Sequence, residues 1–298
     1  MPVQTGKTPG ALRSNPYGKE IRMTDDEFEQ LVRFIYEKTG IEFKSSKKYL
    51  LENRLSPRLV ELGCTSYHDY LLLLKYDSNN EFQHFTSAIT INETSFLRNM
   101  PQLRVFVDEV LPRVVKQAQD RAVRKVRLWS AGCSSGEEPY SLALLIAEKH
   151  PRLFNQKAVE IVATDIDEEI LAKAREGVYS EFSLRNLSPI QKNNHFTREG
   201  RYFRITPKIK SIVRFTRLNL HDSARMRLMH DVDIIFFRNV MIYFGTEARK
   251  QILANMYDSL NPGGYLFLGH SESLHGLTKA FKLVNFGKII VYQKQIRV

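Results

Sequence analysis

The hydrophobic period changes near residue 125, and this change constrains the fold more than any other feature of the chain. Before it, apolar residues recur at helical spacing, as at Leu51, Leu55, Leu59 and Leu62. After it, short apolar runs typical of buried strands alternate with helical stretches. The clearest runs are Val126–Ala131, Val159–Thr164 and Val232–Phe237. Strands that alternate with helices predict an α/β fold with a parallel, doubly wound sheet, here preceded by a helical domain.

The same patterns predict four segments along the chain. They are a disordered tail (1–20), a helical N-terminal domain (21–90), a linker and long helix (91–125) and the α/β domain (126–298). Between about 178 and 216 the pattern changes to short strand candidates, among them Tyr202–Ile205 and Ile212–Phe215. We expect this stretch to form a small antiparallel β-subdomain inserted in the α/β domain.

Composition excludes several classes of protein. No apolar run approaches the roughly 20 residues that span a bilayer, and the N-terminus has no apolar segment typical of a signal peptide. The two cysteines, Cys64 and Cys133, lack metal-ligand spacing, so we expect no metal site and a cytoplasmic location. The net charge of +11 indicates either an acidic partner or only a well-solvated surface.

A glycine loop, Gly132–Tyr140, follows the first predicted strand. Its G-x-S-x-G spacing matches a hydrolase nucleophile elbow around Ser134, with Asp233 and His270 in the required order. The loop also suits a cofactor cradle, in which the adjacent acids Glu137 and Glu138 favour a cationic ligand. A third interpretation is a plain helix start, where acids favour the helix dipole. The loop alone leaves the three interpretations open.

Five motifs, in order, resemble the CheR family of chemotaxis receptor methyltransferases. They are Ile91–Arg98, Trp129–Ser141, Ala163–Asp167, Arg238–Phe244 and Leu268–Ser273. The resemblance extends from about Thr24 to the C-terminus. It implies a class I, Rossmann-like methyltransferase fold with a helical N-terminal domain and an inserted β-subdomain. It also implies transfer of a methyl group from S-adenosylmethionine (SAM) to glutamate side chains of chemoreceptors, leaving S-adenosylhomocysteine (SAH).

Motif by motif, the resemblance also implies a set of site residues. The cofactor is expected at Asn92, Thr94, Arg98, Glu138, Asp165, Asn219, Leu220, Asn239 and Val240. Arg98 is expected to hold the substrate carboxylate. Tyr243 is expected to orient a substrate oxygen or line the methyl pocket, or else to be a core residue. His270 has no proton to move in such a reaction, so we expect a structural role.

Two departures from the family pattern stand out. Phe237 replaces the usual cysteine at the end of a buried strand, which we expect to change packing only. Thr197–Tyr202 lacks the extra Gly-x-Gly loop of members that dock on a receptor's C-terminal pentapeptide, so the chain resembles a pentapeptide-independent member.

The expected partner is the acidic, helical cytoplasmic region of chemoreceptors. Four basic residues of the N-terminal domain are candidates for aligning on it, as is the basic β-subdomain. The four are Lys47, Lys48, Arg54 and Arg58. We expect a monomer that neither binds nucleic acid nor inserts in a membrane. Three alternatives remain: a nucleic-acid methyltransferase, a non-catalytic binding module on the same fold, and a serine hydrolase.

Overall fold

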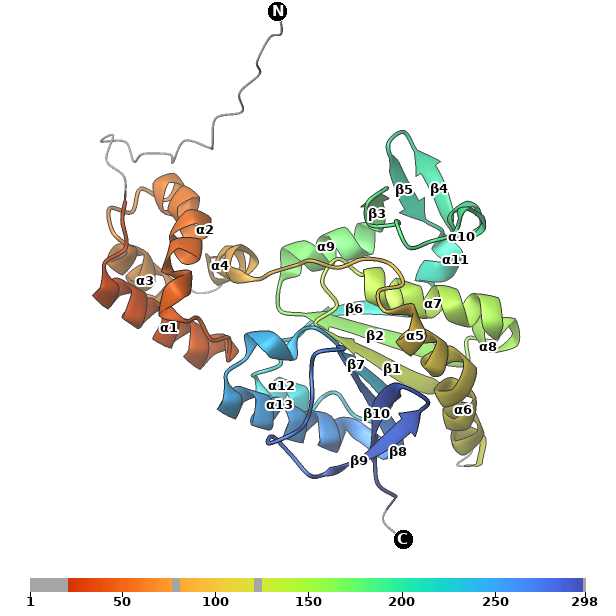
Figure 1. The fold of residues 1–298 in the computed structure, drawn as a ribbon. Coiled ribbons are helices and arrows are strands. Elements are labelled where there is room, and N and C mark those ends of the chain that lie inside the picture. Colours follow the sequence, from red (N-terminus) through yellow and green to blue (C-terminus); the bar gives the residue numbers. More distant parts are fainter. Residues whose placement is uncertain (1–20, 77–80, 121–124, 297–298) are drawn as a thin grey trace, which may run out of the picture. The chain divides into compact units, whose positions relative to one another are not determined.

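A computed structural model describes residues 21–76, 81–120 and 125–296. The chain divides into two compact units, one made of residues up to 37 together with 42–90, the other of residues 38–41 together with 91–298 (Figure 1). The predicted tail, residues 1–20, lies outside the described residues. Among the described residues, no helix combines the length and the hydropathy needed to cross a bilayer.

The first unit is helical, as its apolar period predicts. Its elements are α1 (Asp25–Thr39), the short 3-10 helix η1 (Ser45–Lys47), α2 (Lys48–Glu61), α3 (Tyr67–Tyr76) and α4 (Glu81–Ile89). A capping box starts α1, because Thr24 N donates to Glu27 Oε2 at 2.8 Å and Glu27 N donates to Thr24 Oγ1 at 3.2 Å. Leu51, Leu55 and Leu59 are fully buried on one side of α2, as predicted, but Leu62, the fourth residue of the predicted stripe, follows the end of the helix and is 36% exposed.

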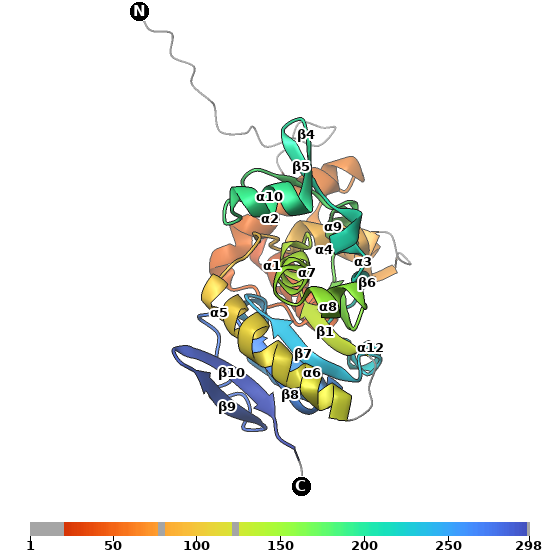
Figure 2. The same ribbon diagram turned by 90° about the vertical axis from the view of Figure 1, so that its right-hand side faces the viewer.

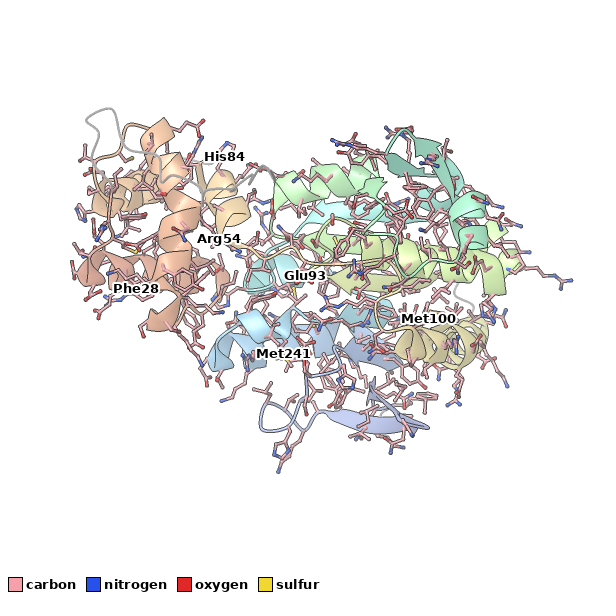
Figure 3. All side chains as sticks on the ribbon, turned by 45° about the horizontal axis from the view of Figure 1, so that its top comes forward. Phe28, Arg54, His84, Glu93, Met100 and Met241 are labelled. Atoms are coloured by element: carbon pink, nitrogen blue, oxygen red, sulfur yellow. The ribbon has the colours of Figure 1, made fainter. Side chains whose placement is uncertain are left out.

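Three of the four predicted receptor-facing cations have partners inside this unit. Lys48 Nζ pairs with Asp25 at 2.6 Å. Arg54 Nη1 donates to the carbonyls of Ile89 and Thr90 at 3.1 and 3.0 Å, where α4 ends (Figure 3). Arg58 pairs with the buried Glu81 at 2.6 Å. These side chains therefore hold α2 to its neighbours, a function that the sequence analysis did not predict.

The second unit contains a seven-stranded sheet in the order β6-β2-β1-β7-β8-β10-β9. Its strands are β1 (Val126–Ala131), β2 (Val159–Asp165), β6 (Val213–Arg217), β7 (Val232–Phe237), β8 (Leu260–Leu268), β9 (Phe281–Phe286) and β10 (Ile289–Lys294). The pairs among β6, β2, β1, β7 and β8 are parallel. β10 pairs antiparallel with β8 and with β9, so an antiparallel hairpin of β9 and β10 ends the sheet.

Helices cover both faces of this sheet. The long helical segment is continuous through α5 (Met100–Arg104), a π-helical turn η2 (Val105–Val110) and α6 (Leu111–Asp120). α6 and α7 (Glu137–Lys149) pack on one face against Leu128, Ile161 and Phe236 (Figure 2). α13 (Thr246–Ser259) lies across the sheet from α7 (Figure 1). The remaining helices are α8 (Pro151–Asn155), α9 (Glu168–Glu176), α10 (Pro189–His195), α11 (Pro207–Lys210), α12 (Ser223–Met226) and the 3-10 helix η3 (Met241–Tyr243).

A separate three-stranded antiparallel sheet forms the β-subdomain. It has the order β3-β5-β4, from β3 (Val178–Ser180), β4 (Phe196–Glu199) and β5 (Tyr202–Ile205). The prediction that Ile212–Phe215 is part of this sheet is wrong. That stretch falls largely in β6, which pairs parallel with β2 at the edge of the main sheet. Alternating apolar residues identify a strand but not the sheet that it joins.

Candidate active site

The carboxyl ends of the parallel strands bring the predicted motifs together. β1 lies between β2 and β7, so the chain leaves β1 toward one side of the sheet and later returns to the other. In open α/β sheets, ligands bind in the crevice at such a switch point. The loop after β1, Asp165 at the end of β2 and Asn239 after β7 all lie at this edge.

The loop after β1 requires its first glycine. Gly132 has a φ of +75°, and a Cβ there would lie 2.6 Å from Val240 Cγ2, so the loops after β1 and β7 are in close contact. Gly132 N and Cys133 N both donate to the carbonyl of Thr164, at 2.8 and 2.9 Å. This ties the loop to the end of β2 and leaves little freedom in either segment.

Asp165 is the most perturbed acid at this edge. Its Oδ2 accepts from Ser134 N at 2.8 Å and its Oδ1 from Asp167 N at 3.1 Å. Burial raises the pKa of Asp165 to about 6, because it disfavours the charged form more than the two N–H groups favour it. Asn92 joins the same group, since its Nδ2 donates to Asp167 Oδ2 at 3.1 Å and its carbonyl accepts from Ser134 Oγ at 3.2 Å.

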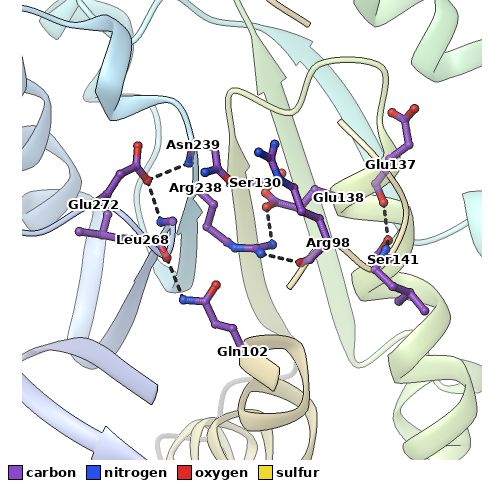
Figure 4. A network of polar contacts seen from close by, with 12 residues as sticks. Arg98, Gln102, Ser130, Glu137, Glu138, Ser141, Arg238, Asn239, Leu268 and Glu272 are labelled. Atoms are coloured by element: carbon purple, nitrogen blue, oxygen red, sulfur yellow. Dashed lines mark hydrogen bonds and ion pairs between the residues drawn. The ribbon is translucent and has the colours of Figure 1, made fainter. Parts of the chain in front are cut away.

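The two acids at the start of α7 have partners within the protein; those of Glu138 are seen in Figure 4. Glu138 accepts from Ser130 Oγ at 2.7 Å and forms a buried ion pair with Arg238 at 3.0 Å. Glu137 accepts from Ser135 Oγ at 2.6 Å, and burial raises its pKa. Glu138 therefore has no uncompensated charge with which to attract a cationic ligand. The role predicted for it at the cofactor stays a prediction.

The backbone of Arg98 is fixed from two sides while its side chain is exposed. Leu97 N donates to Ser141 Oγ at 2.9 Å, and Arg238 Nη2 donates to the carbonyl of Arg98 at 2.6 Å (Figure 4). The guanidinium itself donates only to the carbonyl of Glu93, at 3.3 Å, among the residues that the structure describes. This arrangement positions Arg98 firmly and leaves its charge available for an anion.

Left-handed backbone clusters at the same site. Six described non-glycine residues have a positive φ, and four of them lie here. They are Leu97 (52°) and Asn99 (61°) on either side of Arg98, Ser134 (48°) after β1 and Asn239 (60°) after β7. Such conformations cost roughly 1–3 kcal/mol each and are retained mainly where function needs them. The clustering supports this edge as the functional site.

The other residues singled out in the sequence lie in several different segments of the second unit. Thr94 lies in the segment before α5, beside Arg98. Asn219 and Leu220 follow β6; Asn219 Nδ2 donates to the carbonyl of Lys38 at 2.7 Å, and Leu220 is buried. Tyr243 is half-buried in η3, just after the loop of Asn239 and Val240. Phe237 is fully buried, as expected of a packing substitution.

The geometry does not support the serine hydrolase alternative. Ser134 Oγ donates to the carbonyl of Asn92. Asp233 is at the amino end of β7, opposite to the loop, where its carboxylate accepts from Arg127 N and Asn261 Nδ2 at 2.9 and 2.8 Å. His270 is exposed after β8. The three residues therefore do not form a catalytic triad.

Glu272 connects two loops of the site through hydrogen bonds, a role that was not predicted from the sequence. Its Oε2 accepts from Asn239 N at 2.8 Å and from Gly269 N at 2.7 Å, and its Oε1 accepts from Ile242 N at 3.3 Å (Figure 4). One carboxylate thus joins the loops after β7 and β8. The motif around it was recognised, but spacing alone does not reveal which backbone groups a glutamate binds.

Replacing Glu272 by alanine should lower the free energy of unfolding by about 1–3 kcal/mol, because three N–H groups lose their acceptor. Urea unfolding followed by circular dichroism measures this change. Glu247→Ala is the matched control, since Glu247 is 75% exposed and, among the described residues, forms an ion pair only with Lys250 on the surface. Equal effects of the two substitutions would contradict the organising role of Glu272.

This chain is similar to known proteins over most of its length. Residues 26–90 match the family described as CheR methyltransferase, all-alpha domain, and residues 92–290 match CheR methyltransferase, SAM binding domain. Chemotaxis protein methyltransferase 2 of Vibrio cholerae is 39% identical over 92% of this chain and 95% of that protein. The chemotaxis protein methyltransferase of Escherichia coli is 34% identical over 89% of this chain and 90% of that protein. The chain therefore belongs to the CheR family of SAM-dependent methyltransferases that act in chemotaxis.

Proposed function

We propose that this enzyme transfers the methyl group of SAM to glutamate side chains of chemoreceptors, in the cytoplasm and as a monomer. The observation that carries the proposal is the exposed guanidinium of Arg98, held by its backbone beside the switch point of the sheet. An arginine with no carboxylate partner among the described residues suits a substrate carboxylate. The names of the curated relatives support the pathway.

The residues at the sheet edge fit the cofactor. Asp165, ending β2, offers a carboxylate to ribose hydroxyls, and the left-handed loops at Ser134 and Asn239 let the backbone approach a ligand closely. Arg238 Nε is buried without a hydrogen-bond partner in the described protein, which leaves one donor for a ligand. We propose that the adenosine end lies near Asp165, Asn219, Leu220, Asn239 and Val240, and the methionine end near Asn92, Thr94, Arg98 and Glu138.

The residues of this chain need only to position the substrate carboxylate and to exclude water from the site. When bound, SAM supplies a methyl group on a sulfonium centre, which an ionised carboxylate oxygen accepts directly. A glutamate with an ordinary pKa near 4.3 is already ionised at neutral pH, so no general base is required. Arg98 orients the carboxylate, and Tyr243 lines the approach from η3. Positioning of this kind lowers the barrier without moving a proton.

Transfer of label from methyl-labelled SAM tests the substrate class. An acidic receptor fragment should be labelled, whereas the same fragment with glutamine at the methyl-accepting positions should not, and neither should transfer RNA. Labelling of RNA in preference to the receptor fragment would favour the nucleic-acid methyltransferase. Absence of label from every substrate, with SAH still bound, would favour the non-catalytic binding module.

We propose that receptors dock on the first unit and the β-subdomain without need of a C-terminal pentapeptide. In the first unit we expect the receptor to contact the exposed Lys47, because Lys48, Arg54 and Arg58 already have partners within the protein. In the β-subdomain, β4 and β5 are joined by only Gly200 and Arg201, which supports the absence of a pentapeptide-binding loop. Receptor fragments with and without their C-terminal residues should be methylated at the same rate.

Affinity for SAH should depend on the ionisation of Asp165. Its pKa in the folded protein without ligand is about 6, and only the carboxylate form accepts from two ribose hydroxyls. Affinity should therefore be constant above pH 7 and fall by up to about tenfold per pH unit below 6. Because the folded pKa lies above the unfolded one, the stability of the unliganded protein should fall as pH rises from about 4 to 6.

Titration calorimetry with SAH at pH 5, 6 and 7.5 measures this dependence. Asp165→Asn is the control: its affinity should be lower at neutral pH and should change little between pH 7.5 and 5. A wild-type affinity that stays constant across this range would show that Asp165 does not bind the ribose as a carboxylate.

A further inference from the structure

A pocket of about 240 Å³ opens beside Arg98, between two segments that are far apart in the sequence. One wall is the segment before α5, residues 93–99, marked in Figure 3 by Glu93 and Met100. The other wall is Arg185 and Asn186, in the connection between β3 and α10. The motifs of the sequence analysis include the first wall but not the second.

The two walls are fixed to each other. Asn186 Nδ2 donates to the carbonyl of Phe96 at 3.0 Å, and Phe96 N donates to the carbonyl of Ser183 at 3.1 Å. The ring of Phe96 packs edge-on against Tyr179 and Phe196 at centroid distances of 4.8 and 5.2 Å. The pocket is therefore a formed feature of this unit, with Arg98 on one wall and Arg185 on the other.

Arg185 forms no ion pair with any residue that the structure describes. Its Nη1 donates to the carbonyl of Phe182 at 2.8 Å, and its guanidinium stacks over the exposed Phe182 ring at 4.1 Å. Neither Arg98 nor Arg185 has a carboxylate within ion-pair distance among the described residues. The charge of Arg185 lowers the pKa of Glu137, but burial of Glu137 has the larger effect, so that pKa is raised overall. Two guanidinium groups and one carboxylate, that of Glu93, line the pocket, so its lining keeps a net positive charge and favours an anion.

We propose that Arg185 is a specificity-determining residue that, together with Arg98, selects the ionised side chain of the substrate glutamate over its amide or methyl ester. The inference rests on the proposed function and adds a residue to it. Methyl transfer converts the carboxylate into a neutral ester, which two guanidinium groups bind less well than an anion. Arg98 and Arg185 therefore bind the unmodified glutamate more tightly than its methyl ester, which favours release of the product.

Binding of two receptor fragments to the full-length protein saturated with SAH tests this role, because no reaction takes place in that complex. One fragment carries a methyl-accepting glutamate, and the other carries glutamine at that position. The wild type should bind the glutamate fragment about tenfold more tightly than the glutamine fragment. In Arg185→Gln this ratio should fall to about twofold or less, and Arg185→Lys should lie between.

Arg201→Gln is the matched control. Arg201 belongs to the same β-subdomain region and stacks over Tyr202 at 5.0 Å, as Arg185 does over Phe182, but it does not line the pocket. The control should keep the wild-type ratio, and all variants should bind SAH with wild-type affinity, which shows that they are folded. A wild-type ratio in Arg185→Gln would overturn the inference alone. A wild type that neither binds nor methylates receptor fragments would overturn the proposed function with it.

Discussion

Arg98→Ala should lower kcat/KM for receptor methylation by about 100-fold or more, because it removes both the charge and the geometry that hold the substrate carboxylate. The backbone bonds to Ser141 and Arg238 do not involve the lost side chain, so the fold should be unaffected. Initial rates over a range of receptor fragment concentrations, at saturating SAM, measure the effect.

Arg104→Ala provides the comparison for that experiment. Arg104 is an exposed arginine near the same segment, at the end of α5, and it does not line the pocket beside Arg98. It should retain at least half of the wild-type kcat/KM. If Arg98→Ala and Arg104→Ala gave the same rate as the wild type, Arg98 would have no role in the reaction.

Arg238→Met should be the most destabilising single change at the site. It leaves the carboxylate of Glu138 buried without its ionic partner and removes the donor to the carbonyl of Arg98. Loss of one member of a buried ion pair typically costs about 3–5 kcal/mol. Urea unfolding measures the loss, and methylation should be lost with it.

The double substitution Glu138→Met with Arg238→Met separates stability from function. Replacing both members of a buried ion pair by apolar residues is often neutral for stability, so most of the lost free energy of unfolding should return. Methylation should not return, because the backbone of Arg98 has lost one of the two hydrogen bonds that fix this segment, the one from Arg238. A double variant as unstable as Arg238→Met would show that the two charges do not act as a pair.

Local patterns predicted the elements that position the site. The apolar runs located β1, β2 and β7, and in a parallel sheet this is enough to bring their following residues to one edge, including Asp165 and Asn239. These features depend on residues a few positions apart, which a sequence displays directly.

Long-range pairing could not be predicted in the same way. The partners Glu138 and Arg238 lie 100 positions apart, and Arg54 reaches carbonyls 34 to 36 positions away. A charge on a helix has the same appearance in a sequence whether it caps a neighbouring helix or faces solvent. For this reason the sequence did not reveal that Arg58 of α2 pairs with Glu81, or that Glu138 pairs with Arg238.

Methyl transfer to a glutamate carboxylate is tested most directly by determining which kind of bond the enzyme makes. A receptor fragment labelled from methyl-labelled SAM is treated with mild base, and the volatile label is collected. A glutamyl methyl ester hydrolyses under these conditions, so nearly all of the label should appear as methanol. Label that stays on the fragment would indicate methylation of nitrogen and would contradict methyl transfer to a glutamate carboxylate.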